Sequence, residues 1–234
     1  MASHLTRKAL KQDKFAVEVG HTVDYFATHR KGAFRYGAIA LVVVVIVAAV
    51  FYYRNSRHSV RQQVLGEAIS FTTAPVGTAA PSGGTSFPNE NAKKEAVTKA
   101  FTKIVSDYSG SEEAYIAGYY LAGRATDAGK MDEARAKYQD VADHAGANYA
   151  SLAKLALAQI DFAANRSKEA ETLLKELIDH PTDLVSKNQA TITYARGIGP
   201  TRPEEARKLL LQVAGEKSDV SQIALSALND LPQK

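Results

Sequence analysis

The stretch DEARAKYQDV, residues 132–141, recurs in altered form as KEAETLLKEL at 168–177 and as EEARKLLLQV at 204–213. Each copy has alanine in its third position and large apolar residues four and seven positions after that alanine. A shorter match, KEA, occupies residues 94–96, so the four alanines are spaced 38, 36 and 36 residues apart. A period between about 20 and 50 residues is typical of solenoids built from helical repeats.

A second helical stretch precedes each of the three long copies, so each repeat is predicted to hold two helices. A short break with a turn-forming residue separates the two. These stretches are residues 112–127, 148–164 and 183–196, and the breaks fall at Gly129, at Asn165 and over 197–203. The predicted fold class is therefore all-α.

The alanines of the repeat have a predicted packing role. Two antiparallel helices approach closely only where one of them presents a small side chain, and larger residues then interlock around it. We expect Ala134, Ala170 and Ala206 to lie in such seams. A last helix around residues 219–231 has no later partner and is predicted to cap the solenoid.

These positions resemble the tetratricopeptide repeat, a helical hairpin of about 34 residues. The matching, repeat-packing residues are Leu121, Ala122, Ala134, Tyr138 and Val141 in the first unit, Leu157, Ala158, Ala170, Leu174 and Leu177 in the second, and Ala206, Leu210 and Val213 in the third. The match is degenerate, because Thr193 and Tyr194 stand at the leucine and small-residue positions of the third unit and the chain has no tryptophan.

A separate signal is the apolar run RYGAIALVVVVIVAAVFYYR, residues 35–54. Its eighteen uncharged residues would span about 27 Å as a helix, close to the roughly 30 Å hydrocarbon core of a bilayer. A buried β-strand rarely exceeds about eight residues. A cleaved signal peptide is disfavoured because the run lacks a small-residue cleavage site. We therefore expect a transmembrane helix over residues 36–53 that acts as an uncleaved anchor.

Basic residues gather around this run. Residues 1–35 hold seven Lys and Arg against three acids, whereas residues 91–234 hold nineteen basic and twenty acidic side chains. This pattern favours contact with lipid headgroups and predicts no nucleic-acid partner. The numbers of basic residues immediately before and after the helix are equal. The further basic residues of the tail, Arg7, Lys8, Lys11 and Lys14, favour a cytoplasmic N-terminus with the C-terminal domain exported.

The remaining segments are assigned by composition. The tail, residues 1–35, is predicted to contain an amphipathic helix. This helix either lies on the membrane surface or makes no specific packing contact. Residues 54–71 are predicted to form a juxtamembrane helix, and residues 72–91, rich in Pro, Gly and Ser, a flexible linker or insertion. The repeat domain then occupies residues 92–234.

The order of a basic tail, one span, a juxtamembrane helix and degenerate repeats resembles a bacterial family, the ancillary subunit of the Sec translocon. That resemblance implies a single-pass protein of the inner membrane with a periplasmic repeat domain. It also implies that residues 55–71 pair with residues 92–107 as a first hairpin, which leaves the Pro/Gly-rich stretch as an insertion inside the hairpin.

In tetratricopeptide solenoids the first helix of each pair lines the concave face. The alignment places there Tyr119, Gly123 and Thr126 from the first unit, Leu155, Gln159 and Phe162 from the second, and Asn188 and Thr191 from the third. Such a mixture suits extended polypeptide or partner helices. The alternative is that Leu155 and Phe162 pack only against neighbouring repeats.

Motifs that carry chemistry are missing from the sequence. It contains no His-Glu-x-x-His, no Gly-x-Ser-x-Gly and no phosphate-binding glycine loop. We therefore expect no enzyme activity, catalytic residue, cofactor or metal.

The leading hypothesis is a membrane-anchored adaptor that links the export channel to periplasmic chaperones or unfolded clients. The alternative is a scaffold for cell-envelope assembly or division that self-associates as a homo-oligomer.

Overall fold

The computed structural model describes residues 30–78, 84–216 and 220–232, with side chains in the first helix described at residues 36, 38–48 and 58–73. The predicted amphipathic helix of the tail therefore lies outside the described residues. The chain divides into two compact units, residues 1–59 and residues 60–234. The helix α2, Arg30–Thr73, contains the predicted membrane helix and the predicted juxtamembrane helix.

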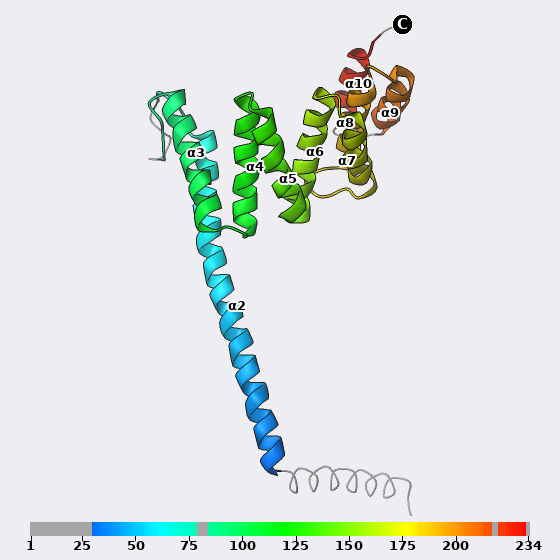
Figure 1. Cartoon of the computed structure of the whole chain (residues 1–234). Helices are drawn as coiled ribbons and strands as arrows, with labels where there is room; N and C mark the ends of the chain where they lie inside the picture. The colour runs from blue at the N-terminus through cyan, green and yellow to red at the C-terminus, as the bar shows by residue number, and fades with distance from the viewer. Residues whose placement is uncertain (1–29, 79–83, 217–219, 233–234) are drawn as a thin grey trace, which may run out of the picture. The chain divides into compact units, whose positions relative to one another are not determined.

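The repeat domain is a succession of antiparallel helices (Figure 1). In order, they are α3 (Glu90–Asp107), α4 (Glu112–Asp127), α5 (Met131–His144), α6 (Ala147–Ala163), α7 (Ser167–Asp179), α8 (Lys187–Ile198), α9 (Pro203–Gly215) and α10 (Ser221–Asn229). Over the part of the chain that the structure describes there is no β-strand, only an isolated bridge between Val76 and Phe87. The predicted all-helical class is confirmed.

Two rows of helices build this domain. Each helix from α3 onward contacts the next one along the chain, and α4 also contacts α6, α6 contacts α8, and α8 contacts α10. We call α4, α6, α8 and α10 the inner row, and α3, α5, α7 and α9 the outer row. Helices on the concave side of a solenoid lie closest together, so these direct contacts place the inner row on that side.

Residues 60–73 of α2 pack against α3. Leu65 and Ala68 share one buried cluster with Val97, Phe101 and Ile104 of α3, and that cluster continues into α4. The juxtamembrane segment thus completes a first helical hairpin with α3, as the family resemblance implied.

The ends of the Pro/Gly-rich segment are held in place by packing and hydrogen bonds. The Phe87 N–H donates to the carbonyl of Pro75 at 3.0 Å, and the Gly77 N–H donates to the carbonyl of Phe87 at 2.9 Å. The Phe87 ring lies edge-on to Phe71 of α2, with ring centres 5.7 Å apart. The helices reach Thr73 on one side and start at Glu90 on the other.

Local chemistry explains where the helices begin and end. Asn89, Ser111 and Ser186 each cap a helix, because their side-chain oxygens accept the N–H three residues on. The turns after α4 and α6 use left-handed residues, Gly129 with φ 72° and Asn165 with φ 60°. The predicted breaks at Gly129 and Asn165 therefore lie in the observed turns. The break predicted over 197–203 is shorter in the structure, because α8 ends at Ile198 and α9 begins at Pro203.

One helix starts later than the sequence pattern predicted. The stretch 183–196 was expected to be helical, but α8 begins at Lys187. The hydroxyl of Thr182 accepts the Val185 N–H at 3.2 Å and bonds the Ser151 hydroxyl of α6 at 2.7 Å. These bonds fix residues 182–185 as a loop, and Val185 turns fully into the core.

The alanine seam lies where the repeat predicted it. Ala134, Ala170 and Ala206 have no exposed surface, and each belongs to a buried cluster that crosses from one helix pair to the next. Leu121 is half-buried against the cluster that α2, α3 and α4 share. The other matching residues are buried: Ala122, Tyr138, Val141, Leu157, Ala158, Leu174, Leu177, Leu210 and Val213. Over residues 30–78, 84–216 and 220–232, no helix combines the length and the apolar character needed to cross a membrane.

Replacing Ala134 by leucine should lower the free energy of unfolding by about 1–3 kcal/mol, because the added carbons have no space in the seam. Ala136 is exposed on the same helix, and Ala136→Leu should change stability by less than about 0.5 kcal/mol. Urea unfolding followed by circular dichroism measures both. Similar losses in the two variants would contradict a close-packed seam.

Candidate functional site

Tyrosines gather on the inner row where α4 meets α6. The Tyr119 ring lies edge-on to three others, with centres 5.9 Å from Tyr120, 5.5 Å from Tyr138 and 5.7 Å from Tyr149. Edge-to-face rings at this spacing attract one another beyond their apolar burial. We call these four residues the tyrosine cluster. Tyr138 is buried, and the other three keep part of their surface exposed.

The cluster depends on how α6 is positioned against α4. The Gly146 N–H, just before α6, donates to the Glu112 carboxylate of α4 at 2.8 Å. A Cβ at position 146 would lie 3.0 Å from Oε1, the other oxygen of that carboxylate, so glycine leaves room for this contact. The bond brings the first turn of α6, which carries Tyr149, beside Tyr119.

The cluster is uncharged at neutral pH. Burial, followed by the proximity of Tyr120, raises the pKa of Tyr149 to about 12. Burial also raises the pKa of Tyr119 and of Tyr138. The face thus presents neutral aromatic rings with phenol hydroxyls, which can pack on apolar side chains and exchange hydrogen bonds with a peptide backbone.

The residues predicted for the concave face lie in different environments. Tyr119 lies in the tyrosine cluster, and Thr126 is half-buried on the same helix with its hydroxyl on the Ala122 carbonyl. On α6, Gln159 is exposed, whereas Leu155 is buried in the largest core cluster. Phe162 packs against that same cluster.

Phe162 also limits which side chain can occupy the facing position on α8. A Cβ at Gly197 of α8 would lie 2.1 Å from the Phe162 ring, so the phenylalanine fills the space that a larger residue there would need. On α8 itself, the Asn188 side chain donates to Glu216 at 2.7 Å, and Thr191 is buried with its hydroxyl on the Lys187 carbonyl. The structure therefore brings Tyr119 together with aromatic neighbours but not with the predicted residues of α6 and α8.

Sequence reasoning missed Tyr120 and Tyr149. Tyr120 follows Tyr119 directly and stacks on Phe101 of α3, with ring centres 4.8 Å apart. Tyr149 lies in the first turn of its helix, ahead of the positions that the motif alignment assigns to the concave face. The available signal was the number of tyrosines, since four of the eleven in the chain fall between residues 115 and 138.

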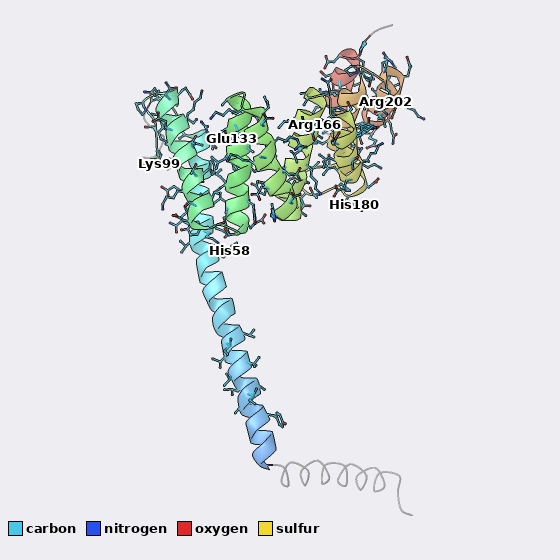
Figure 2. The ribbon with its side chains drawn as sticks, viewed as in Figure 1. His58, Lys99, Glu133, Arg166, His180 and Arg202 are labelled. Carbon is cyan, nitrogen blue, oxygen red and sulfur yellow. The ribbon has the colours of Figure 1, made fainter. Side chains whose placement is uncertain are left out.

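Buried acid–arginine contacts join the inner row to the outer row. Asp161 of α6, almost fully buried, accepts Arg135 Nε of α5 at 2.9 Å and Arg166 Nε at 2.7 Å. Arg166 lies at the turn into α7 (Figure 2). Charge-assisted hydrogen bonds of this kind fix direction as well as distance. One carboxylate thus ties three consecutive helices.

Similar contacts join the neighbouring repeats. Glu113 of α4 accepts Arg61 Nε of α2 at 2.9 Å, and its side chain is nearly buried. Further along, Glu171 of α7 pairs with Arg202 at the start of α9 and accepts the Tyr194 hydroxyl of α8 at 3.2 Å. Among the residues that the structure describes, no group of three or more His, Asp or Glu side chains could hold a metal ion.

Comparison with known proteins identifies one family. A family model described as "Tetratricopeptide repeat-like domain" matches residues 34–180, which is more than half of the chain. No curated protein and no solved structure matches the chain.

Changing Asp161 to asparagine should destabilise the domain by about 1.5–3 kcal/mol, because two charge-assisted hydrogen bonds are lost from a buried site. The matched control is Glu133→Gln, which removes the exposed ion pairs with Lys130 and Lys137 and should cost less than about 1 kcal/mol. Thermal and urea unfolding measure both variants. An equal loss of stability in the two variants would contradict a structural role for Asp161.

Stability should also fall in alkaline solution. The folded-state pKa of Tyr149 is about 12 against an ordinary value of 10.0, so the unfolded chain loses this proton first as the pH rises. The contribution is fully present below pH 10 and declines as the pH approaches 12. Urea unfolding at several pH values should show this decline in the native protein and a smaller one in Tyr149→Phe. Identical pH profiles would contradict the raised pKa.

Proposed function

This chain belongs to the tetratricopeptide repeat-like domain family, and on that premise we propose that it is a membrane-anchored adaptor that binds extended polypeptide at its tyrosine cluster. Domains of this family serve protein–protein interaction, and their helical repeat fold is typically non-catalytic. The observation that carries the proposal is the tyrosine cluster itself, with three rings partly exposed on the row that lines the concave side.

The chemistry of the cluster favours polypeptide as its ligand. Tyrosine supplies a large contact area with few rotatable bonds, and it is enriched among the residues that contribute most binding energy at interfaces. The rings of Tyr119 and Tyr149 are already fixed by edge-to-face contacts and lose little freedom on binding. The four residues of the tyrosine cluster carry no cationic group, so they favour side-chain and backbone contacts over recognition of a terminal carboxylate.

Membrane anchoring is the second part of the proposal. Every large apolar side chain described between residues 39 and 47 is more than half exposed, including Ile39, Leu41 and the consecutive valines 42–45. A helix that is apolar on all sides requires an apolar environment. Burying each such side chain is favourable by about 1.5–3 kcal/mol. The lipid bilayer is the proposed environment, and the rest of the predicted span, residues 37 and 49–53, lies outside the described side chains.

The cellular setting follows from the sequence. We propose that the chain lies in a bacterial inner membrane with a cytoplasmic N-terminus and a periplasmic repeat domain. Its order of segments resembles the ancillary subunit of the Sec translocon, so the proposed partners are export-channel subunits, periplasmic chaperones and unfolded clients. The completed hairpin of α2 with α3 supports this reading, since the anchor then continues directly into the first repeat.

Self-association is the alternative function, and one observation favours it. Leu211 of α9 and Ile223 and Leu225 of α10 are exposed at the terminal cap, with exposed fractions of 56%, 46% and 43%. The end of a solenoid is usually polar. An apolar end would suit a second copy in a scaffold for envelope assembly or division.

Cell fractionation tests the anchor and its orientation. We expect the full-length chain in the membrane fraction, released by detergent but not by high salt. Added protease should cut between residues 73 and 90 only after the outer barrier is opened. Recovery in the aqueous fraction would contradict the anchor, and cleavage from the cytoplasmic side alone would contradict the export role.

Binding to an unfolded client tests the tyrosine cluster. The affinity of the detergent-solubilised chain for reduced, carboxymethylated α-lactalbumin should fall at least about tenfold in Tyr149→Ala. The matched control is Tyr115→Ala on α4, whose half-buried ring stacks on His144 instead of the cluster. An equal loss in both variants, or none in Tyr149→Ala, would contradict the proposed site.

A further inference from the structure

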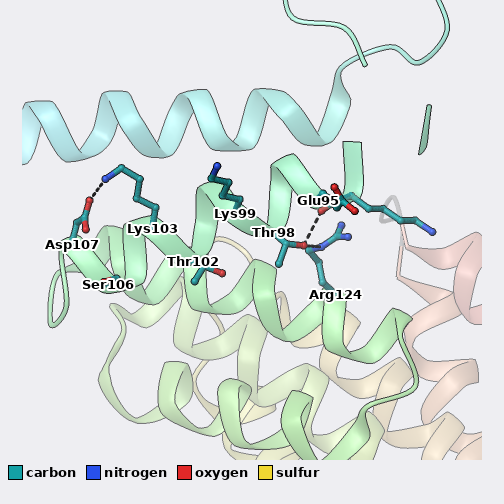
Figure 3. Close-up of a pocket in the computed structure, with 9 residues that line it drawn as sticks. Glu95, Thr98, Lys99, Thr102, Lys103, Ser106, Asp107 and Arg124 are labelled. Atoms are coloured by element: carbon teal, nitrogen blue, oxygen red, sulfur yellow. Dashed lines mark hydrogen bonds and ion pairs between the residues drawn. The ribbon is translucent and has the colours of Figure 1, made fainter. Parts of the chain in front are cut away.

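A second surface, distinct from the tyrosine cluster, lies along α3 of the outer row. Here an open groove of about 730 Å³ is bounded by one face of α3 and by Arg124 from the end of α4 (Figure 3). Its other basic residues are Lys94, Lys99 and Lys103. Four cations thus border the groove against two acids, Glu95 and Asp107.

These cations are only partly satisfied within the protein. Lys103 pairs with Asp107 one turn further along α3, and Arg124 Nε donates to the Thr98 hydroxyl at 2.7 Å. Among the residues that the structure describes, neither Lys94 nor Lys99 forms an ion pair, although Glu95 lies one turn before Lys99. Lys99 and Lys103 are also one turn apart, a spacing at which like charges repel. The groove therefore holds positive charge that does not stabilise its own helix.

A straight line of hydroxyl residues follows the groove, although most of its exposed lining is apolar. Thr98, Thr102 and Ser106 follow one another at intervals of four residues and form a line of hydroxyls along α3. From Lys94 to Ser106 the helix rises about 18 Å. An extended chain covers that length with about five residues. The groove thus matches a short extended segment in length. The Thr98 hydroxyl already donates to the Lys94 carbonyl and accepts Arg124 Nε, so Thr102 and Ser106 are the hydroxyl partners for such a segment.

We propose that this groove binds an acidic, extended peptide segment of a partner protein. Carboxylates of the segment would lie against Lys94, Lys99 and Arg124, and its backbone would face the hydroxyl line. An anionic lipid surface fits less well, because Glu95 and Asp107 would repel it. A peptide can place neutral or basic residues beside these two acids.

This inference stands apart from the peptide site on the inner row. The two surfaces share no residue: the groove lies mainly along α3 of the outer row, and the exposed rings of the tyrosine cluster lie on α4 and α6 of the inner row. Together they would allow one domain to hold two polypeptides at once, the arrangement that a bridging adaptor requires. Exposed ion pairs each contribute little and are screened by salt, so binding at the groove should be modest and salt-dependent.

Fluorescence anisotropy of labelled hexaglutamate against the full-length chain in detergent tests the groove, with labelled hexaglutamine as the uncharged comparison. The test variant is Lys94→Glu with Lys99→Glu, and the matched control is Lys168→Glu with Lys208→Glu, two exposed lysines on α7 and α9. Hexaglutamate affinity should fall at least about tenfold in the test variant and less than about twofold in the control. Circular dichroism should show the same helical content in all three proteins, since the four lysines are exposed.

Several results would overturn the proposal. An equal loss of hexaglutamate affinity in the two variants would show that only the net charge of the chain matters. Equal affinities for hexaglutamine and hexaglutamate would show that the carboxylates are not recognised. Loss of hexaglutamate binding in Tyr149→Ala would place the peptide on the inner row. Glycerophosphoglycerol, the soluble headgroup of an anionic phospholipid, should not displace hexaglutamate. If it binds more tightly than the peptide through Lys94 and Lys99, the groove is a lipid site.

Discussion

The close approach of helices at buried alanines is the constraint on which the rest of this structure depends. Ala134, Ala170 and Ala206 have no exposed surface, so the backbones of adjacent helices meet with almost no side chain between them. Larger residues such as Tyr138 and Leu174 then interlock on either side of each seam. Because the same small residue returns every 36 residues, each helix pair stacks on the last in the same way, and two rows of helices result.

Close packing sets how near the helices lie, and buried charge sets how they are aligned. Asp161 contacts arginines from two flanking elements, while Glu113 and Glu171 make comparable contacts at the neighbouring junctions. A buried ion pair contributes little net stability compared with an apolar substitute, but it accepts only one geometry. These contacts fix α6 against α5 and α7, and α4 against α2, while the bond from the Gly146 N–H to Glu112 positions α6 beside α4 and brings Tyr149 beside Tyr119. The geometry of the proposed binding surface thus depends on residues outside the tyrosine cluster.

The proposed functions follow from what this packing leaves uncovered. The apolar residues 39–47 of α2 are exposed, the tyrosine cluster presents aromatic rings on α4 and α6, and the groove on α3 presents two lysines that form no ion pair among the described residues. Each surface has its own chemistry, which suits an anchor, an apolar or mixed peptide and an acidic peptide respectively. An adaptor needs this separation because two ligands with similar requirements would compete for one site.

The sequence by itself determined the all-helical class, the period of the repeat, the alanine seam and the turns at Gly129 and Asn165, because these depend on short-range spacing and backbone preference. It could not determine the start of α8, which depends on the contact of Thr182 with Ser151, thirty-one residues earlier. Nor could it separate Leu155, which packs into the core, from Tyr149, which lines the inner row, since both stand on the same helix. Only the tertiary structure decided these points, because the environment of a side chain is set by neighbours from other repeats.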